Sequence, residues 1–256
     1  MGPHPVLILG GTTEAKAVAE ALAARPDLAP LLSLAGRTLS PRPQPVPVRV
    51  GGFGGAEGLA RFLKEGSFRL MVVATHPFAA RISAHAARAA AETGVPAIQL
   101  TRPAWQKQLG DRWQEVETVT EAVSALGDAP KRVFLAIGRQ EAAAFEAAPQ
   151  HAYLIRSVDP VDPPLTLPRM ESLLATGPFD EAAEEALLRA RGIEVVVAKN
   201  SGGAATYGKI AAARRIGLPV ILVARPPLPD LRQASRIDEV LAFADHVLAP
   251  AKKRGV

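Results

Sequence analysis

Hydrophobic and polar positions along the chain follow two patterns in turn. Short runs of β-branched or aliphatic residues end at a glycine or a polar residue, and alanine-rich stretches with a helical apolar period separate them. Buried strands that alternate with amphipathic helices are typical of a parallel α/β sheet. In the first half, strands are predicted at 6–9, 31–35, 46–50, 70–74 and 97–100, and helices at 14–24, 56–64, 79–93 and 119–125.

The alternation starts again after a Gly-Asp-Ala-Pro stretch at 127–130, which predicts a domain boundary there. We expect an α/β fold of two Rossmann-like lobes, residues 1–126 and 127–256, with parallel sheets and a cleft between them. The proline-rich stretch 159–168 is predicted to be a loop. In the second lobe, strands are predicted at 133–137, 153–157, 194–198 and 220–224, and helices at 140–147, 180–191, 204–216 and 237–244.

Composition narrows the class of protein. With 48% hydrophobic residues in 256, the chain can bury a core, and no apolar run approaches the ~20 residues that span a bilayer. The absence of Cys excludes disulfides, thiol catalysis and Cys-ligated metals. The net charge of +5 is spread over both halves, which argues against nucleic-acid binding and favours a small anionic ligand. We expect a cytoplasmic monomer without a membrane partner and without a bound metal.

The first candidate site follows the first strand. Gly10, Gly11, Thr12, Thr13 and Glu14 lead from this strand into a helix, where free backbone N–H groups and the helix dipole favour a phosphate. Ligands of open α/β sheets bind at such strand ends. We therefore expect these five residues to bind a cofactor, although two glycines before a helix are also common in an ordinary tight turn.

The next strand ends extend this prediction. Arg37 follows the second strand with no acid nearby, an arrangement that favours the 2′-phosphate of NADPH over the free ribose of NADH. Gly52 and Phe53 lie in a glycine-rich loop that lets the backbone approach a flat ligand. Thr75 and His76 follow the fourth strand, a position that makes both of them candidate site residues. The alternatives are an exposed loop arginine, a core phenylalanine and a structural histidine.

The second lobe offers polar residues at equivalent strand ends. Arg139 and Lys199 would bind carboxylates, the arginine through its planar fork and the lysine as a point charge. Ser201 and Gly202 continue the Lys199 loop, and Tyr207 lies on the helix predicted at 204–216. Exposed basic residues without a function are common, so a structural role stays open for each.

Taken together, these segments resemble the precorrin-6A reductase family of cobalamin biosynthesis over about residues 5–248. The most specific segments are Thr-His-Pro-Phe at 75–78 and Lys-Asn-Ser-Gly-Gly at 199–203. One departure is Val73, where the family pattern has Asp, which puts any role of that Asp in orienting His76 in doubt. The other segments of the resemblance are Gly-Gly-Thr-Thr-Glu at 10–14, Gly-Arg-Thr at 36–38, Gly-Gly-Phe-Gly-Gly at 51–55 and Gly-Arg-Gln-Glu at 138–141.

The resemblance implies an NADPH-dependent reduction of the C18=C19 bond of precorrin-6A to give precorrin-6B. The first lobe would bind NADPH and the second would contribute to the site of the anionic tetrapyrrole. His76, Tyr207 or a water would donate the proton. A cobalt-loaded substrate is an alternative within the same family.

Two alternatives of other classes stay open. A non-catalytic two-lobe module that binds an anionic ligand would share every basic residue above, but it would not bind a nicotinamide. A short-chain-like oxidoreductase would need a Tyr-x-x-x-Lys pair on a helix, and four residues after Tyr207 the chain has Ala211. The second alternative is the weaker one.

Overall fold

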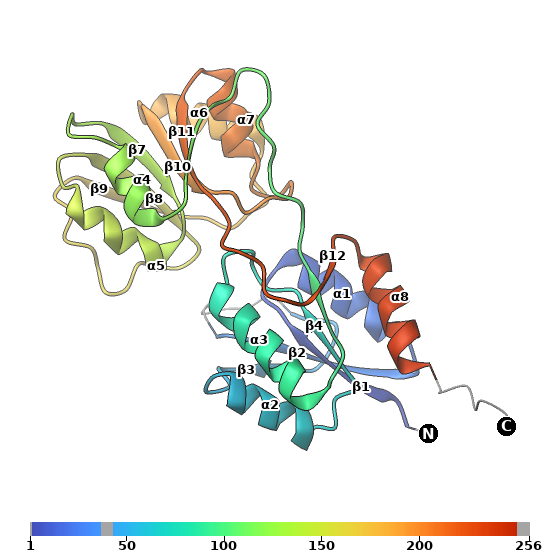
Figure 1. Cartoon of the computed structure of the whole chain (residues 1–256). Coiled ribbons are helices and arrows are strands. Elements are labelled where there is room, and N and C mark those ends of the chain that lie inside the picture. The colour runs from blue at the N-terminus through green and yellow to red at the C-terminus, as the bar shows by residue number, and fades with distance from the viewer. Residues whose placement is uncertain (1, 37–42, 250–256) are drawn as a thin grey trace, which may run out of the picture. The chain divides into compact units, whose positions relative to one another are not determined.

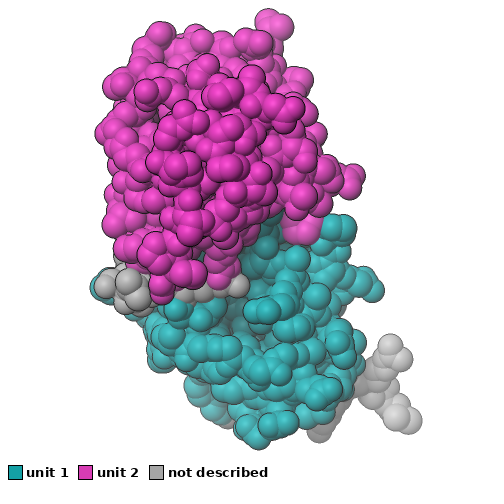
Figure 2. All heavy atoms as spheres, turned by 90° about the vertical axis from the view of Figure 1, so that its left-hand side faces the viewer, with its two compact units in different colours: residues 1–102, 227–256 teal, residues 103–226 magenta. Residues whose placement is uncertain are grey.

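A computed structural model describes residues 2–36 and 43–249 of the chain. It divides into two compact units (Figures 1 and 2): unit 1 comprises residues 1–102 and 227–256, and unit 2 comprises residues 103–226. Each unit is built on a six-stranded sheet in which every strand pair is parallel. The prediction of an α/β fold with parallel sheets is confirmed.

The sheet of unit 1 has the order β12-β5-β4-β1-β2-β3, and helices cover both of its faces (Figure 1). Alternate residues of β1 enter two different cores. Val6 and Ile8 pack with helices α1 and α8, and Leu7 and Leu9 pack with α2 and α3. The elements are β1 (His4–Leu9), α1 (Thr13–Ala23), β2 (Leu28–Leu34), β3 (Val48–Val50), α2 (Ala56–Glu65), β4 (Leu70–Val73), α3 (Ala80–Thr93), β5 (Ala97–Leu100), β12 (Arg232–Ala234) and α8 (Ile237–Leu248).

The sheet of unit 2 has the order β6-β11-β10-β7-β8-β9. Phe134, Leu154 and Val196, from three neighbouring strands, point to the same face of the sheet and pack against α6 and α7. Both tryptophans of the chain belong to this core. The elements are β6 (Arg112–Val116), α4 (Val119–Ala125), β7 (Arg132–Ala136), α5 (Arg139–Ala142), the 3₁₀ helix η1 (Ala143–Ala147), β8 (Ala152–Ser157), β9 (Met170–Leu174), α6 (Glu181–Ala190), β10 (Val195–Lys199), α7 (Gly208–Arg215) and β11 (Pro219–Val223).

The unit boundaries differ from the predicted division at residues 126 and 127. β6 pairs with β11 in unit 2, and β12, which follows unit 2 in the chain, pairs with β5 in unit 1. Each sheet therefore takes one of its edge strands, β6 or β12, from the other side of the predicted boundary. No strand was predicted at β6, β9 or β12, because these edge strands are short and largely exposed and carry no continuous apolar run.

Helix caps follow the local sequence. The Thr12 hydroxyl accepts a hydrogen bond from the Ala15 amide at the start of α1, and the Asp180 carboxylate accepts from the Ala182 and Ala183 amides at the start of α6. Threonine and aspartate are both residue types that the N-cap position of a helix favours. None of the helices in the described part of the chain combines the length and the apolarity that a membrane span requires.

Candidate functional site

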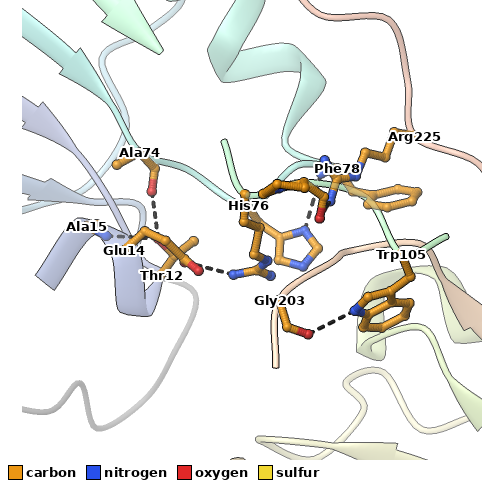
Figure 3. A network of polar contacts seen from close by, with 11 residues as sticks. Thr12, Glu14, Ala15, Ala74, His76, Phe78, Trp105, Gly203 and Arg225 are labelled. Atoms are coloured by element: carbon orange, nitrogen blue, oxygen red, sulfur yellow. Dashed lines mark hydrogen bonds and ion pairs between the residues drawn. The ribbon is translucent and has the colours of Figure 1, made fainter. Parts of the chain in front are cut away.

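The turn after β1 is built by close packing and by one threonine. A Cβ at Gly10 would lie 2.5 Å from Leu32 Cδ1 and 3.0 Å from the Ala15 Cβ, so any larger residue would have to displace the Leu32 side chain. The Thr12 hydroxyl donates to the Ala74 carbonyl at 2.8 Å (Figure 3) and caps α1, so its only proton is committed to the fold. Thr13 is exposed, and a Cβ at Gly11 would meet nothing within 4 Å. The backbone of the turn, more than the Thr12 hydroxyl, is available to a ligand.

Glu14 lies in the first turn of α1 and forms an ion pair with Arg102, the last residue of the first segment of unit 1. Arg102 Nη1 donates to Glu14 Oε2 at 2.7 Å, and both side chains are largely buried. Burial alone would raise the pKa of the Glu14 carboxyl, but the hydrogen bond from Arg102 and the positive charge of Arg102 hold this pKa below its ordinary value. Glu14 is therefore ionised at neutral pH, and its negative charge is compensated beside the amino terminus of α1.

The loop after β3 is organised by a residue that the sequence analysis missed. Phe53 packs edge-to-face on Phe62 with ring centroids 5.2 Å apart, on the same side of the sheet as α2. The guanidinium of Arg49 lies 4.0 Å from the centre of the Phe53 ring and donates to the carbonyls of Gly51 and Gly52. Gly52 is exposed. Arg37 lies outside the described residues.

The Thr-His-Pro-Phe segment follows β4. The Thr75 hydroxyl is buried and lies 3.3 Å from the Ser83 hydroxyl. His76 is exposed, and its Nδ1 accepts a hydrogen bond from the Phe78 amide at 3.2 Å (Figure 3). A neutral imidazole that accepts at Nδ1 carries its proton on Nε2. Nε2 is then the atom from which His76 can donate a proton.

Charged residues gather at the carboxyl edge of the unit 2 sheet. Lys199 Nζ, at the end of β10, donates to Glu141 Oε1 at 2.5 Å, and Arg139 Nη1 lies 4.0 Å from Asp159 Oδ2. The two predicted carboxylate binders therefore each face a carboxylate of the chain itself. Such pairs preorganise basic groups, and a ligand carboxylate has to share or displace the partner. The sequence analysis did not identify Glu141, although it stands in the same motif as Arg139.

The Lys199 loop is hydrogen-bonded to residues 103–105, which begin unit 2 and which we call the connector. We call this set of contacts the loop–connector clasp. Asn200 pairs with the Trp105 backbone in both directions: its Oδ1 accepts from the amide at 2.8 Å, and its Nδ2 donates to the carbonyl at 3.1 Å. The Trp105 indole donates to the Gly203 carbonyl at 2.8 Å (Figure 3). Arg225 donates from Nε to the Asn200 carbonyl at 2.8 Å and from Nη2 to the Pro103 carbonyl at 3.2 Å.

The remaining predicted residues of unit 2 lie at or next to this clasp. Ser201 and Gly202 are buried, and a Cβ at Gly202 would collide with the Pro103 carbonyl oxygen and with the Arg225 guanidinium. The Tyr207 ring packs on Trp105, and its hydroxyl accepts a hydrogen bond from Arg214 at 2.8 Å. Arg214 also pairs with the buried Asp111. These contacts depend on residues far apart in the sequence, and no local signal marks them.

Two units, each a six-stranded parallel sheet in the described part of the chain, with glycine turns and basic side chains at the strand ends, define the class of Rossmann-like α/β proteins. The family model described as "Precorrin-6x reductase CbiJ/CobK" matches residues 5–245. The chain belongs to this family. The resemblance found in its motifs is confirmed.

Individual relatives cover almost the full chain. The chain is 62% identical over 246 residues to a "Precorrin-6A reductase" of Sinorhizobium sp, which covers 96% of this chain and 94% of the relative. It is 47% identical to a "Precorrin-6A reductase" of Rhodobacter capsulatus, with 98% and 99% covered. A solved structure entitled "CobK precorrin-6A reductase" superposes with a TM-score of 0.91 at 46% identity and covers 99% of this chain and 100% of that one.

Proposed function

We propose that this protein reduces precorrin-6A with NADPH at the C18=C19 bond of the macrocycle, giving precorrin-6B in cobalamin biosynthesis. The observation that carries the proposal is the 62% identity over 96% of the chain to a relative named for this reaction. The relatives described above carry the name of the metal-free substrate, which favours precorrin-6A over its cobalt-loaded form.

Two features of unit 1 support the assignment of the cofactor to this unit. Backbone amides at the start of α1 follow the Gly10-Gly11 turn, and the charge of Glu14 is already balanced by Arg102. We assign the pyrophosphate to residues 10–14 and the 2′-phosphate to Arg37. Gly52 and Phe53 would border the adenosine half of the cofactor. A Cβ at Gly52 would meet nothing within 4 Å, which supports a close approach of the ligand to the backbone there.

Unit 2 would bind the polyacidic macrocycle. Lys199 and Arg139 supply positive charge at the carboxyl edge of the sheet, and Ser201 and Gly202 shape the loop that follows Lys199. Thr75 in unit 1 is assigned to the substrate as well. A planar guanidinium and a point-like ammonium are the groups that pair best with carboxylates.

The reaction needs one hydride and one proton. Bound NADPH would supply the hydride for one carbon of the double bond and would be oxidised to NADP⁺. The neighbouring carbon takes a proton from His76 Nε2, from the Tyr207 hydroxyl or from water. Since Tyr207 accepts a hydrogen bond from Arg214, its own O–H proton is left to donate elsewhere. Positioning of the two reactants, rather than covalent chemistry by the protein, supplies most of the rate.

An anaerobic assay that follows the absorbance of reduced nicotinamide tests the proposal. We expect oxidation of one NADPH per precorrin-6A, faster than with NADH and faster than with the cobalt-loaded macrocycle. Mass spectrometry should show a product heavier by two hydrogens. Absence of NADPH oxidation with both macrocycles would overturn the proposal. Oxidation with the cobalt-loaded form alone would show that this form, and not precorrin-6A, is the substrate.

Replacement of Lys199 with alanine should raise the KM for precorrin-6A about tenfold or more while NADPH binding stays unchanged. The reason is that a charge-assisted hydrogen bond contributes about 1.5–3 kcal/mol. Lys16→Ala is the matched control, because Lys16 is an exposed lysine of α1 whose ion-pair partner, Glu20 four residues on, is also exposed. An unchanged KM in Lys199→Ala would remove Lys199 from the substrate site.

A further inference from the structure

Arg49, on β3, joins the ends of three strands in unit 1. Its Nη1 donates to the Gly51 carbonyl at 2.6 Å and to the Ser33 hydroxyl at 3.2 Å, and its Nη2 donates to the Gly52 carbonyl at 2.7 Å. Ser33 is buried near the end of β2, and its carbonyl accepts from the Gly10 amide at 3.0 Å. One chain of hydrogen bonds thus runs from the turn after β1, through the end of β2, to the loop after β3.

This loop would have little shape of its own. Residues 51–55 include Gly51, Gly54 and Gly55 with φ values of 120°, 78° and 104°, and a glycine-rich segment loses much conformational entropy when it is ordered. Two carbonyls that accept from the same guanidinium fix the direction of the first turn. An arginine can make this pair of bonds because its donors lie in one rigid plane.

Aromatic rings hold the guanidinium in place. Its central carbon lies 4.0 Å from the ring centre of Phe53 and 5.1 Å from that of Phe62, and both rings pack against the core beneath α2. The Arg49 guanidinium is therefore held by the two aromatic rings and in turn holds the carbonyls of the 51–55 loop. This arrangement differs from that of a surface arginine that waits for an anion.

We propose that Arg49 is a positioning residue for the cofactor: it holds the 51–55 loop, together with the end of β2, in the conformation that accepts the adenosine half of NADPH. The inference rests on the proposed function. Arg49 acts through the loop rather than on the 2′-phosphate, so its loss should weaken NADPH and NADH alike.

The test compares Arg49→Gln, Arg49→Lys and the wild type by nucleotide fluorescence titration and steady-state kinetics. We expect Arg49→Gln to raise the Kd of NADPH and of NADH by the same factor, about tenfold, while kcat at saturating NADPH changes less than about threefold. Arg49→Lys should recover part of the affinity, since an ammonium can donate to one of the two carbonyls. Arg61→Gln, which removes an exposed arginine of α2, is the matched control.

Hydrogen exchange at the amides of residues 52–55 provides a readout that needs no ligand. Faster exchange in Arg49→Gln, with the other amides of unit 1 unchanged, is expected. Unchanged exchange and unchanged nucleotide affinity in the folded variant would overturn the proposal, and so would a loss confined to NADPH. If the wild type binds neither nucleotide, the proposed function fails, and the exchange result alone decides whether Arg49 orders the loop.

Discussion

Replacement of Glu184 with glutamine is expected to lower the free energy of unfolding of unit 2 by about 3–5 kcal/mol. Glu184, on α6, and Arg156, on β8, form a two-pronged ion pair with N–O distances of 2.5 and 2.9 Å. The side chains are only 5% and 6% exposed. A glutamine cannot balance the guanidinium, so the variant leaves an uncompensated charge in the core.

The surroundings of the ion pair increase the free-energy cost of leaving the Arg156 guanidinium without its carboxylate. The Arg156 guanidinium carbon lies 3.7 Å from the ring centre of Phe179 and 4.8 Å from that of Phe134, so aromatic faces take the place of water. Desolvated cation–π contacts of this kind contribute about 2 kcal/mol, less than the cost of about 3–5 kcal/mol for breaking a buried ion pair. We therefore expect the double variant Arg156→Met/Glu184→Leu to regain most of the lost stability.

Tryptophan fluorescence during urea unfolding measures this effect selectively. Both tryptophans of the chain, Trp105 and Trp113, are buried in unit 2, so their emission reports that unit. Glu185→Gln is the control one residue away, because Glu185 pairs with the exposed Arg189 and Arg215 and should cost less than about 1 kcal/mol. Equal midpoints for Glu184→Gln and Glu185→Gln would show that the buried pair contributes nothing.

The sequence predicts those parts of the fold that depend on neighbouring residues. The apolar run of β1, the glycines that end it and the Thr12 cap lie within ten residues, so periodicity and capping rules suffice to find them. β6 and β12 depend on pairing with strands that lie far along the chain, and their own residues are largely polar. The exchange of edge strands between the units therefore leaves no local signal.

The same distinction applies to the candidate site. Lys199 and Arg139 stand at strand ends, a position that can be read from the pattern alone. Their partners Glu141 and Asp159, and the contacts of Arg49, appear only when separate strand ends meet in space. One signal was available for the buried ion pair: Arg156 interrupts an apolar strand, and a charged residue in a buried strand needs a partner.

Replacement of Gly202 with alanine is expected to lower kcat/KM for precorrin-6A by about a hundredfold or more, while NADPH binding is kept, because a misplacement of about 1 Å in a substrate site can cost this much. Gly202 has a φ of 68°, and the Pro103 carbonyl and the Arg225 guanidinium occupy the space that a side chain at this position would need. A methyl group there must push the loop away from residue 103. The loop–connector clasp would open, and with it the arrangement of Ser201 and Lys199 would change.

Gly217→Ala separates backbone strain from loss of the clasp. Gly217 has a φ of 72°, but a Cβ there would meet nothing within 4 Å. It should therefore show only the cost of a left-handed alanine, about 1–2 kcal/mol. Overpacking adds about 1–3 kcal/mol at Gly202. The difference in stability and activity between the two variants then measures the close approach itself.

Asn200→Asp opens the clasp without changing the volume of the side chain. An aspartate still accepts from the Trp105 amide, but it cannot donate to the Trp105 carbonyl, and the two oxygens that now face each other repel. If the clasp positions the Lys199 loop, Asn200→Asp should lose activity in the same direction as Gly202→Ala, with the KM for precorrin-6A raised and the Kd for NADPH unchanged. Full activity in both folded variants would show that the loop finds its geometry without the connector.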